Sequence, residues 1–172
     1  DAYFHSDTVQ TMGHYVHDLK KLPVNFIVGA AHKFHGPKGV GFLYVNRKNK
    51  IHPLIYGGAQ ERNMRGGTEN VYGIIGLGKA LEIAYRDMAE HQAHTSNVKS
   101  YMIEKLKENF AGISFNGLSG EMDSHVLSAI GADPSRASVR FSFSKFNTKD
   151  EVDIVIEKLK EIVPIKSEMS KA

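Results

Sequence analysis

Two short apolar runs, residues 25–30 and 40–45, constrain this chain more than any other feature of its sequence. Their length and composition predict two buried strands. Between them lies the loop 31–39, Ala-His-Lys-Phe-His-Gly-Pro-Lys-Gly, which its glycine and proline residues mark as irregular. Open α/β sheets bind their ligands in loops at the carboxyl ends of buried strands. The sequence therefore predicts an α/β fold with a site at residues 31–39.

The residues that follow predict a long loop and then a long helix. Residues 57–70 are polar and rich in glycine, and long ordered loops are often functional. A helical pattern then runs from about Val71 to Asn109, with a break expected near residues 91–97. The apolar residues that share one face of its first half are Ile74, Leu77, Leu81 and Ala84.

The second half of the chain predicts a smaller α+β unit. We expect a brief strand at 113–115, a helix over 124–130 and a strand over 137–143. Because two strands alone form a marginal sheet, we expect a segment to be missing between Gly120 and Glu121. The predicted domain boundaries are therefore 1–90 and 91–172.

A further helix is predicted near the end of this second unit. Thr148 is followed three residues later by Glu151, the pattern of a capping box at a helix start. The apolar face of this helix is made by Val152, Val155, Ile156 and Leu159. The polar tail from Lys166 is expected to be frayed.

The composition excludes several classes of protein. The 172 residues, 41% hydrophobic and 24% charged, are typical of a soluble globular protein. The absence of cysteine excludes disulfides and thiolate metal sites and favours a cytoplasmic location. No apolar run approaches the roughly 20 residues that cross a bilayer. We expect no signal peptide, and the lack of an initiator Met suggests that the chain starts inside a longer gene product. A net charge of +3 without a basic stripe argues against nucleic-acid binding.

Four residues together have the chemistry that a pyridoxal-phosphate site needs. Such a site takes a lysine that forms a Schiff base, a carboxylate beside the pyridinium nitrogen, and an arginine that binds a substrate carboxylate. The candidates are Lys33, Asp7 with Gln10 as a polar neighbour, and Arg140. Taken singly, each has an ordinary alternative: a solvated lysine, an aspartate that caps a helix, and an arginine on the outer side of a strand.

Other kinds of site fit the sequence less well. His5, His32 and His35 occur without an HExxH pattern or an acidic ligand cluster, so no metal site is predicted. The glycines around Lys38 lack the Gly-Lys-Ser/Thr order of a P-loop.

Four blocks of sequence occur in a specific order. They are His5-x-Asp7-x-x-Gln10, the loop 31–39, the glycine-rich stretch 57–70 with its Arg65-x-Gly67-Thr68-Glu69-Asn70, and Ser138-Val139-Arg140-Phe141-Ser142. Together they resemble the cysteine desulfurases of the class V aminotransferase group, over nearly the whole chain. The resemblance implies a fold-type-I pyridoxal-phosphate transferase, with part of the large α/β domain and the small C-terminal α+β domain.

The resemblance assigns cofactor-binding roles to five residues. Lys33 would bind pyridoxal 5'-phosphate covalently, with His32 as its neighbour in the catalytic site. Asp7 would pair with the pyridine nitrogen, and Gln10 would bond the ring hydroxyl. Thr68 would reach the cofactor phosphate of the partner subunit, which implies a homodimer.

The resemblance also implies a substrate and a reaction. Arg140 would bind the carboxylate of L-cysteine, whose sulfur would be removed to leave L-alanine and a protein-bound persulfide. The sulfur would pass to an acceptor protein, for sulfur transfer or iron–sulfur cluster assembly. Two alternatives remain: a related class V lyase or aminotransferase, and a degenerate scaffold protein without catalysis.

The chain departs from the family's pattern in three respects. The phosphate-binding serine three residues before the lysine is Ala30 here. The family's first half, with the histidine stacked on the cofactor ring, is absent. The nucleophilic cysteine is also absent, and its loop would fall at the Gly120/Glu121 junction, where a segment is expected to be missing.

Overall fold

The computed structural model describes residues 2–115 and 138–163. They form two compact units, Asp1–Met88 and Ala89–Ala172. This division lies close to the boundary expected at residue 90. No helix in the described ranges is long and apolar enough to cross a membrane.

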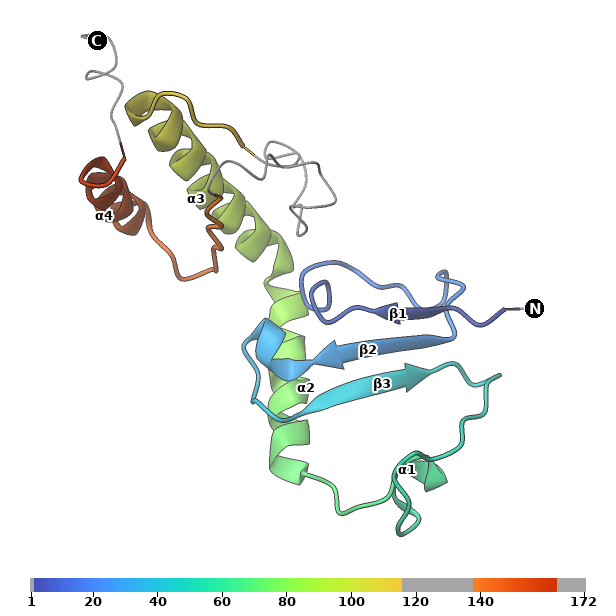
Figure 1. The fold of residues 1–172 in the computed structure, drawn as a ribbon. Coiled ribbons are helices and arrows are strands. Elements are labelled where there is room, and N and C mark those ends of the chain that lie inside the picture. The colour runs from blue at the N-terminus through green and yellow to red at the C-terminus, as the bar shows by residue number, and fades with distance from the viewer. Residues whose placement is uncertain (1, 116–137, 164–172) are drawn as a thin grey trace, which may run out of the picture. The chain divides into compact units, whose positions relative to one another are not determined.

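A small mixed sheet is the centre of the first unit (Figure 1). Among the described residues it has three strands in the order β1 (His5–Asp7), β2 (Phe26–Ala30) and β3 (Gly41–Val45). β1 runs parallel to β2, with Asp7 opposite Val28, and β3 runs antiparallel to β2, with Gly41 opposite Ala30. Strands β2 and β3 confirm the two strands predicted from the apolar runs, whereas β1 was not predicted.

The core of the first unit lies between one face of this sheet and the helix α2 (Val71–Arg86) (Figure 1). Side chains alternate between the two faces of a strand, and in β2 this alternation buries Ile27 and Gly29. The buried cluster consists of Met12, Val24, Ile27, Ala31, Phe34 and Ala84. Leu77 and Leu81 pack against it as expected, but Ile74 is 45% exposed.

Small residues allow α2 to approach the loop after β2 closely. A Cβ atom added at Gly76 would lie 2.6 Å from Pro37 Cγ, and one added at Gly36 would lie 3.1 Å from Ala80 Cβ. This contact begins at Gly76, more than a turn into α2, which explains why Ile74 is not covered.

In the part of the second unit that the structure describes there are two helices, α3 (Met88–Asn109) and α4 (Lys149–Lys160). Its buried cluster consists of Val98, Met102, Phe110, Val152 and Ile156, with Val155 and Leu159 packed against them. The apolar face predicted for α4 is therefore confirmed. The capping box is confirmed too, because Thr148 Oγ1 accepts from the Glu151 amide and Glu151 Oε2 accepts from the Thr148 amide.

Four predicted elements differ from the structure. The long helix breaks at Asp87, not at 91–97, because the latter stretch lacks Gly and Pro and leads directly into the buried Val98. Residues 113–115 and 138–143 are irregular instead of strands, since they join no ladder in the described residues. The loop 57–70 contains a short irregular helix, α1 (Gln60–Asn63). The helix expected at 124–130 and the tail from Lys166 lie outside the described residues.

We predict that two glycines of α2, two residues apart, respond oppositely to alanine. Gly76→Ala should lower the free energy of unfolding by about 1–2 kcal/mol, because the new methyl group overlaps Pro37 and forces the loop to shift. Gly78→Ala is the matched control, since nothing lies within 4 Å of its added Cβ. It should raise stability by roughly 0.5–1 kcal/mol, the ordinary gain for glycine to alanine inside a helix. Urea unfolding of the purified protein measures both, and equal effects would contradict the close approach of α2.

We predict that the capping box makes stability depend on pH. Hydrogen bonds from Thr148 and then Asn147 lower the pKa of Glu151. A carboxyl group with a lowered pKa in the folded state adds stability above its unfolded pKa, and this stability is lost as the pH falls through the folded pKa. Glu151→Gln should therefore lower the urea midpoint at pH 7 and show a smaller loss on acidification. Asp150→Asn, which removes a charge from the same turn but spares the box, is the control. Parallel pH profiles for wild type and Glu151→Gln would contradict this role.

Candidate active site

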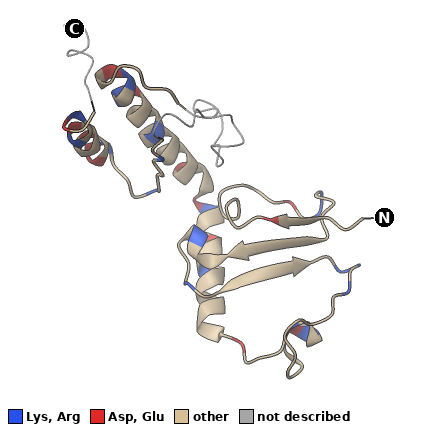
Figure 2. Cartoon of the chain, viewed as in Figure 1, with Lys and Arg blue, Asp and Glu red and all other residues tan. Residues whose placement is uncertain are grey.

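The parallel pairing of β1 and β2 creates the candidate site. Both strands end at the same edge of the sheet because they run in the same direction. Asp7 is the last residue of β1, and Lys33 lies three residues beyond the end of β2. Figure 2 shows the acidic end of β1 and the basic turn after β2 at the same end of the sheet, where both strands finish. A carboxylate and a lysine that are 26 positions apart in the sequence therefore both lie at this edge.

Lys33 lies on a single 3-10 turn, η1 (Ala31–Phe34). Such a turn has three residues per revolution, so Ala31 and Phe34 point to one side and are buried, while His32 and Lys33 point to the other and are exposed. The Ala31 amide donates to Val40 O at 3.1 Å, and the Gly36 amide donates to Ala31 O at 2.8 Å. The turn thus presents the lysine outward from an anchored backbone.

The segment after β1 is fixed by Thr8. This residue is buried, and both its amide (3.2 Å) and its hydroxyl (2.7 Å) donate to Val28 O. Asp7 Oδ1 accepts from the Val9 amide at 2.9 Å. Asp7 itself stays exposed, and so does Gln10. The Asp7 carboxylate is therefore oriented by the backbone amide of Val9. The ordinary alternative, in which Asp7 caps a helix, does not apply.

The same segment is also attached to α2. The Tyr85 hydroxyl donates to Met12 Sδ at 3.4 Å and lies 3.4 Å from His17 Nδ1. Thr11 Oγ1 lies 3.1 Å from His17 Nε2. Burial raises the pKa of Tyr85, which keeps its phenol protonated and able to donate. Residues 8–17 are thereby connected to the sheet on one side and to the helix on the other.

One contact links the two candidate segments directly. His14 Nε2 lies 3.3 Å from the main-chain carbonyl of Lys33. Gly13 makes this approach possible, since its φ is +80° and an added Cβ would lie 2.9 Å from Phe34 Cβ. Sequence reasoning missed both His14 and Thr8, and the only signal was their place within eight residues of Asp7.

The remaining predicted residues lie elsewhere. Thr68 is exposed on the loop between β3 and α2, next to Gly67 and just before Asn70, whose side chain caps α2. Arg140 belongs to the second unit and is exposed in an irregular segment, where a strand was predicted. Ala30 ends β2 opposite Gly41 and brings no hydroxyl to the edge. The structure thus joins Asp7, Gln10, His32 and Lys33 within one unit.

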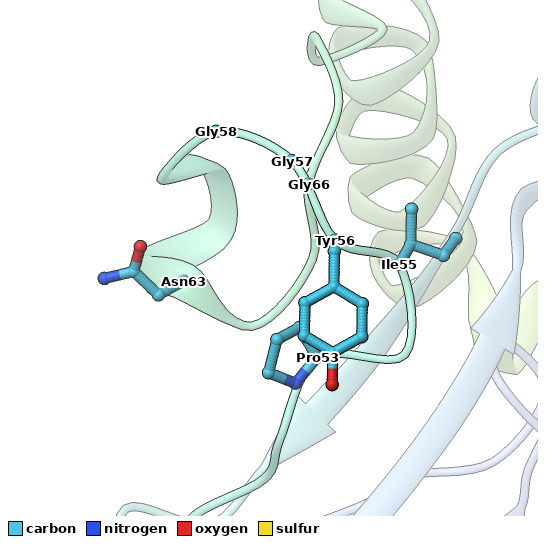
Figure 3. A pocket seen from close by; sticks show the side chains of 7 residues that line it. All are labelled: Pro53, Ile55, Tyr56, Gly57, Gly58, Asn63 and Gly66. Atoms are coloured by element: carbon cyan, nitrogen blue, oxygen red, sulfur yellow. The ribbon is translucent and has the colours of Figure 1, made fainter.

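A small pocket lies in the glycine-rich loop, away from these residues (Figure 3). The Gly66 amide donates to Ile55 O at 2.8 Å, and Gly66 packs on Gly57 so closely that an added Cβ would lie 2.6 Å from Gly57 N. The pocket is lined by Pro53, Ile55, Tyr56, Gly57, Gly58, Asn63 and Gly66.

Within the described ranges, no group of three His, Cys, Asp or Glu residues could bind a metal.

Comparison with known proteins places the chain in a family. Residues 1–128 match the family described as Aminotransferase class-V. A protein named cysteine desulfurase IscS from Dictyoglomus turgidum is 36% identical, covering 98% of this chain and 55% of that protein. Another of that name, from Methanosarcina thermophila, is also 36% identical, covering 94% of this chain and 50% of its own length.

Solved structures give the same result for the fold. A NifS-like protein aligns with a TM-score of 0.78 and 37% identity, covering 93% of this chain and 52% of that one. A NifS-like protein from Rickettsia africae aligns with a TM-score of 0.82 and 27% identity, over 93% of this chain and 53% of its own. The chain thus spans about half the length of the relatives it matches. It belongs to the class V aminotransferase family of fold-type-I pyridoxal-phosphate enzymes.

Proposed function

We propose that this chain forms the lysine-bearing part of a cysteine desulfurase, which removes sulfur from L-cysteine and leaves L-alanine. The observation that carries the proposal is the sheet edge, where β1 ends in Asp7 and the parallel strand β2 leads into the turn that bears Lys33. A relative named cysteine desulfurase IscS matches 98% of the chain. The unit Asp1–Met88 would belong to the large domain and the unit Ala89–Ala172 would be the small domain.

The residues at the edge fit pyridoxal phosphate in most respects. Lys33 is exposed, and its amine takes part in no ion pair among the described residues, so it can react with the cofactor's aldehyde. Asp7 would hold the proton on the ring nitrogen, and Gln10, three residues on, would bond the ring hydroxyl. His32 lies beside Lys33 on the exposed side of η1. Ala30 cannot donate to the phosphate, so the phosphate must rely on other donors.

The chain's own groups supply proton transfer and substrate orientation. Bound pyridoxal phosphate acts as an electron sink for the bonds at the substrate α-carbon. The Lys33 amine, once released from the cofactor, would accept the α-proton and return it, because a neutral amine next to the reacting carbon is a suitable base. Arg140 would bind the cysteine carboxylate through two parallel hydrogen bonds, which fixes which bond at the α-carbon reacts.

The sulfur must go to a thiolate that these 172 residues do not contain, since the chain has no cysteine. The expected position is a loop at the Gly120/Glu121 junction, which lies outside the described residues. The match to the Dictyoglomus turgidum relative runs over 217 aligned residues, more than the 172 of this chain. That relative therefore has residues within the matched span that this chain lacks, which supports a missing segment. The persulfide formed there would pass its sulfur to an acceptor protein for iron–sulfur cluster assembly, in a homodimer where Thr68 contacts the partner's phosphate.

A second candidate function is that of a non-catalytic scaffold. Two observations favour it: Ala30 in place of a phosphate-binding hydroxyl, and the absence of cysteine. Against it, a scaffold has no physical need for Lys33, Asp7 and Gln10 at one edge. Measurements of covalent cofactor binding and of turnover separate the two functions.

We predict that pyridoxal phosphate labels Lys33 covalently. Borohydride reduction of the loaded protein, followed by peptide mass mapping, should place the label on Lys33 and not on Lys38, the exposed lysine five residues further along the same loop. Lys33→Ala should bind the cofactor only non-covalently and lose turnover, whereas Lys38→Ala should keep both. A label on Lys38, or on no lysine, would remove Lys33 from the proposed role.

We predict that Arg140 determines affinity for cysteine and leaves cofactor binding unchanged. Charge-assisted hydrogen bonds contribute about 1.5–3 kcal/mol each, so Arg140→Ala and Arg140→Lys should lower kcat/KM for cysteine by at least ten- to a hundredfold. Arg140→Lys should not restore kcat/KM, because lysine keeps the positive charge but cannot form two parallel hydrogen bonds with the carboxylate. Cofactor absorbance should barely change. The exposed Arg47, in the loop after β3, provides the control variant Arg47→Ala. If both Arg140 variants had normal kcat/KM for cysteine, Arg140 would be excluded from the substrate site.

A further inference from the structure

The carbonyl of Lys33 lacks a partner within its own turn. A single helical turn leaves its last carbonyl groups without internal donors. In η1 the amides of both His35 and Gly36 donate to Ala31 O, so neither bonds the Lys33 carbonyl. The side chain of His14 contacts this carbonyl from outside the turn, with Nε2 at 3.3 Å.

The chemistry of this contact fixes the position of a proton. A carbonyl oxygen only accepts hydrogen bonds, so His14 Nε2 must carry the hydrogen, either as the neutral Nε2–H tautomer or as the imidazolium. Both forms donate in the same direction. The contact therefore works as a cap on the C-terminal end of the turn that bears the lysine.

The backbone that brings His14 to this place is itself well fixed. The amides of Thr11 and Met12 donate to Thr8 O, at 3.0 and 2.7 Å, and the His14 amide donates to Thr11 O at 3.0 Å. Gly13 is buried, with room for no side chain beside Phe34 and Ala84. Since Thr8 is bonded to β2, the cap is anchored to the strand that leads into η1.

We propose that His14 is a positioning residue for Lys33: by capping the Lys33 carbonyl, it couples the segment that bears Asp7 and Gln10 to the turn that bears the lysine. The consequence for catalysis rests on the proposed function of Lys33. A lysine whose main chain is fixed holds its amine at a reproducible distance from the ring that Asp7 binds. Without the cap, η1 keeps its buried side chains but opens more often at its exposed end.

Two measurements on the cofactor-free protein test this coupling. Hydrogen exchange with mass spectrometry reports the opening of residues 31–36 without any cofactor chemistry. Timed addition of pyridoxal phosphate, quenched with borohydride, reports how fast the Lys33 amine condenses with the aldehyde, losing water, before hydride reduces the product. The unlabelled peptide that contains Lys33 in the same sample is the internal reference.

We expect His14→Ala to speed exchange in residues 31–36 and to lower the rate at which Lys33 is labelled, each by about two- to fivefold, as one neutral hydrogen bond allows. His14→Gln should restore both, because its amide can donate to the same carbonyl. His52→Ala, which removes an exposed histidine beyond β3, should change neither.

The outcomes distinguish this inference from the function on which it rests. If wild-type Lys33 takes no label, the proposed function fails, and the exchange data alone decide whether His14 caps the turn. If wild-type Lys33 is labelled but His14→Ala matches wild type in exchange or in labelling, the positioning role is wrong. Failure of His14→Gln to rescue would likewise overturn it, since the capping bond would not be the cause.

Discussion

The parallel ladder between β1 and β2 is the interaction on which the site depends. Three residue pairs, from His5 opposite Phe26 to Asp7 opposite Val28, set the register. Because a parallel pair ends at one edge, the residues that follow both strands meet there, and Thr8 extends the attachment by donating twice to Val28 O. A shift of β1 by one residue would turn Asp7 to the opposite face of the sheet, the face that packs against α2. The ladder is short, so side-chain and turn contacts must help to stabilise it.

Those contacts come from residues with little or no side chain. Gly13 lets the segment after β1 lie on Phe34, Gly36 lies against Ala80, and Gly76 lies under Pro37. At each of these places the backbone or a helix approaches η1 or the loop after it to a distance that a larger residue would prevent. Ala31 and Phe34 are fully buried by this arrangement, which leaves His32 and Lys33 as the outward residues of the turn. The turn is therefore closely packed on one side and exposed on the other, which is in keeping with the role proposed for Lys33.

Among the described residues of the first unit, the sheet is covered on one face only. Ile27 is buried against α2, whereas Asp7 and Leu43, which pair with Val28 on the other face, are exposed. Sheets with parallel strands are normally covered on both faces. The open face is in keeping with a chain that spans about half the length of its relatives.

The sequence by itself determined the elements whose cause is local. Strands β2 and β3 follow from their apolar runs, the start of α4 follows from the capping pattern of Thr148 and Glu151, and the four ordered blocks identified the family. Other features depended on tertiary contacts. β1 is only three residues long and polar, so nothing local marks it as a strand until β2 provides a partner. The helix break lies at Asp87 and not at 91–97, because packing of Val98 and Met102 outweighs the weak helix propensity of the residues before them. The contact of His14 with Lys33 spans 19 positions and has no sequence signature, since it exists only where two turns after parallel strands meet at one edge.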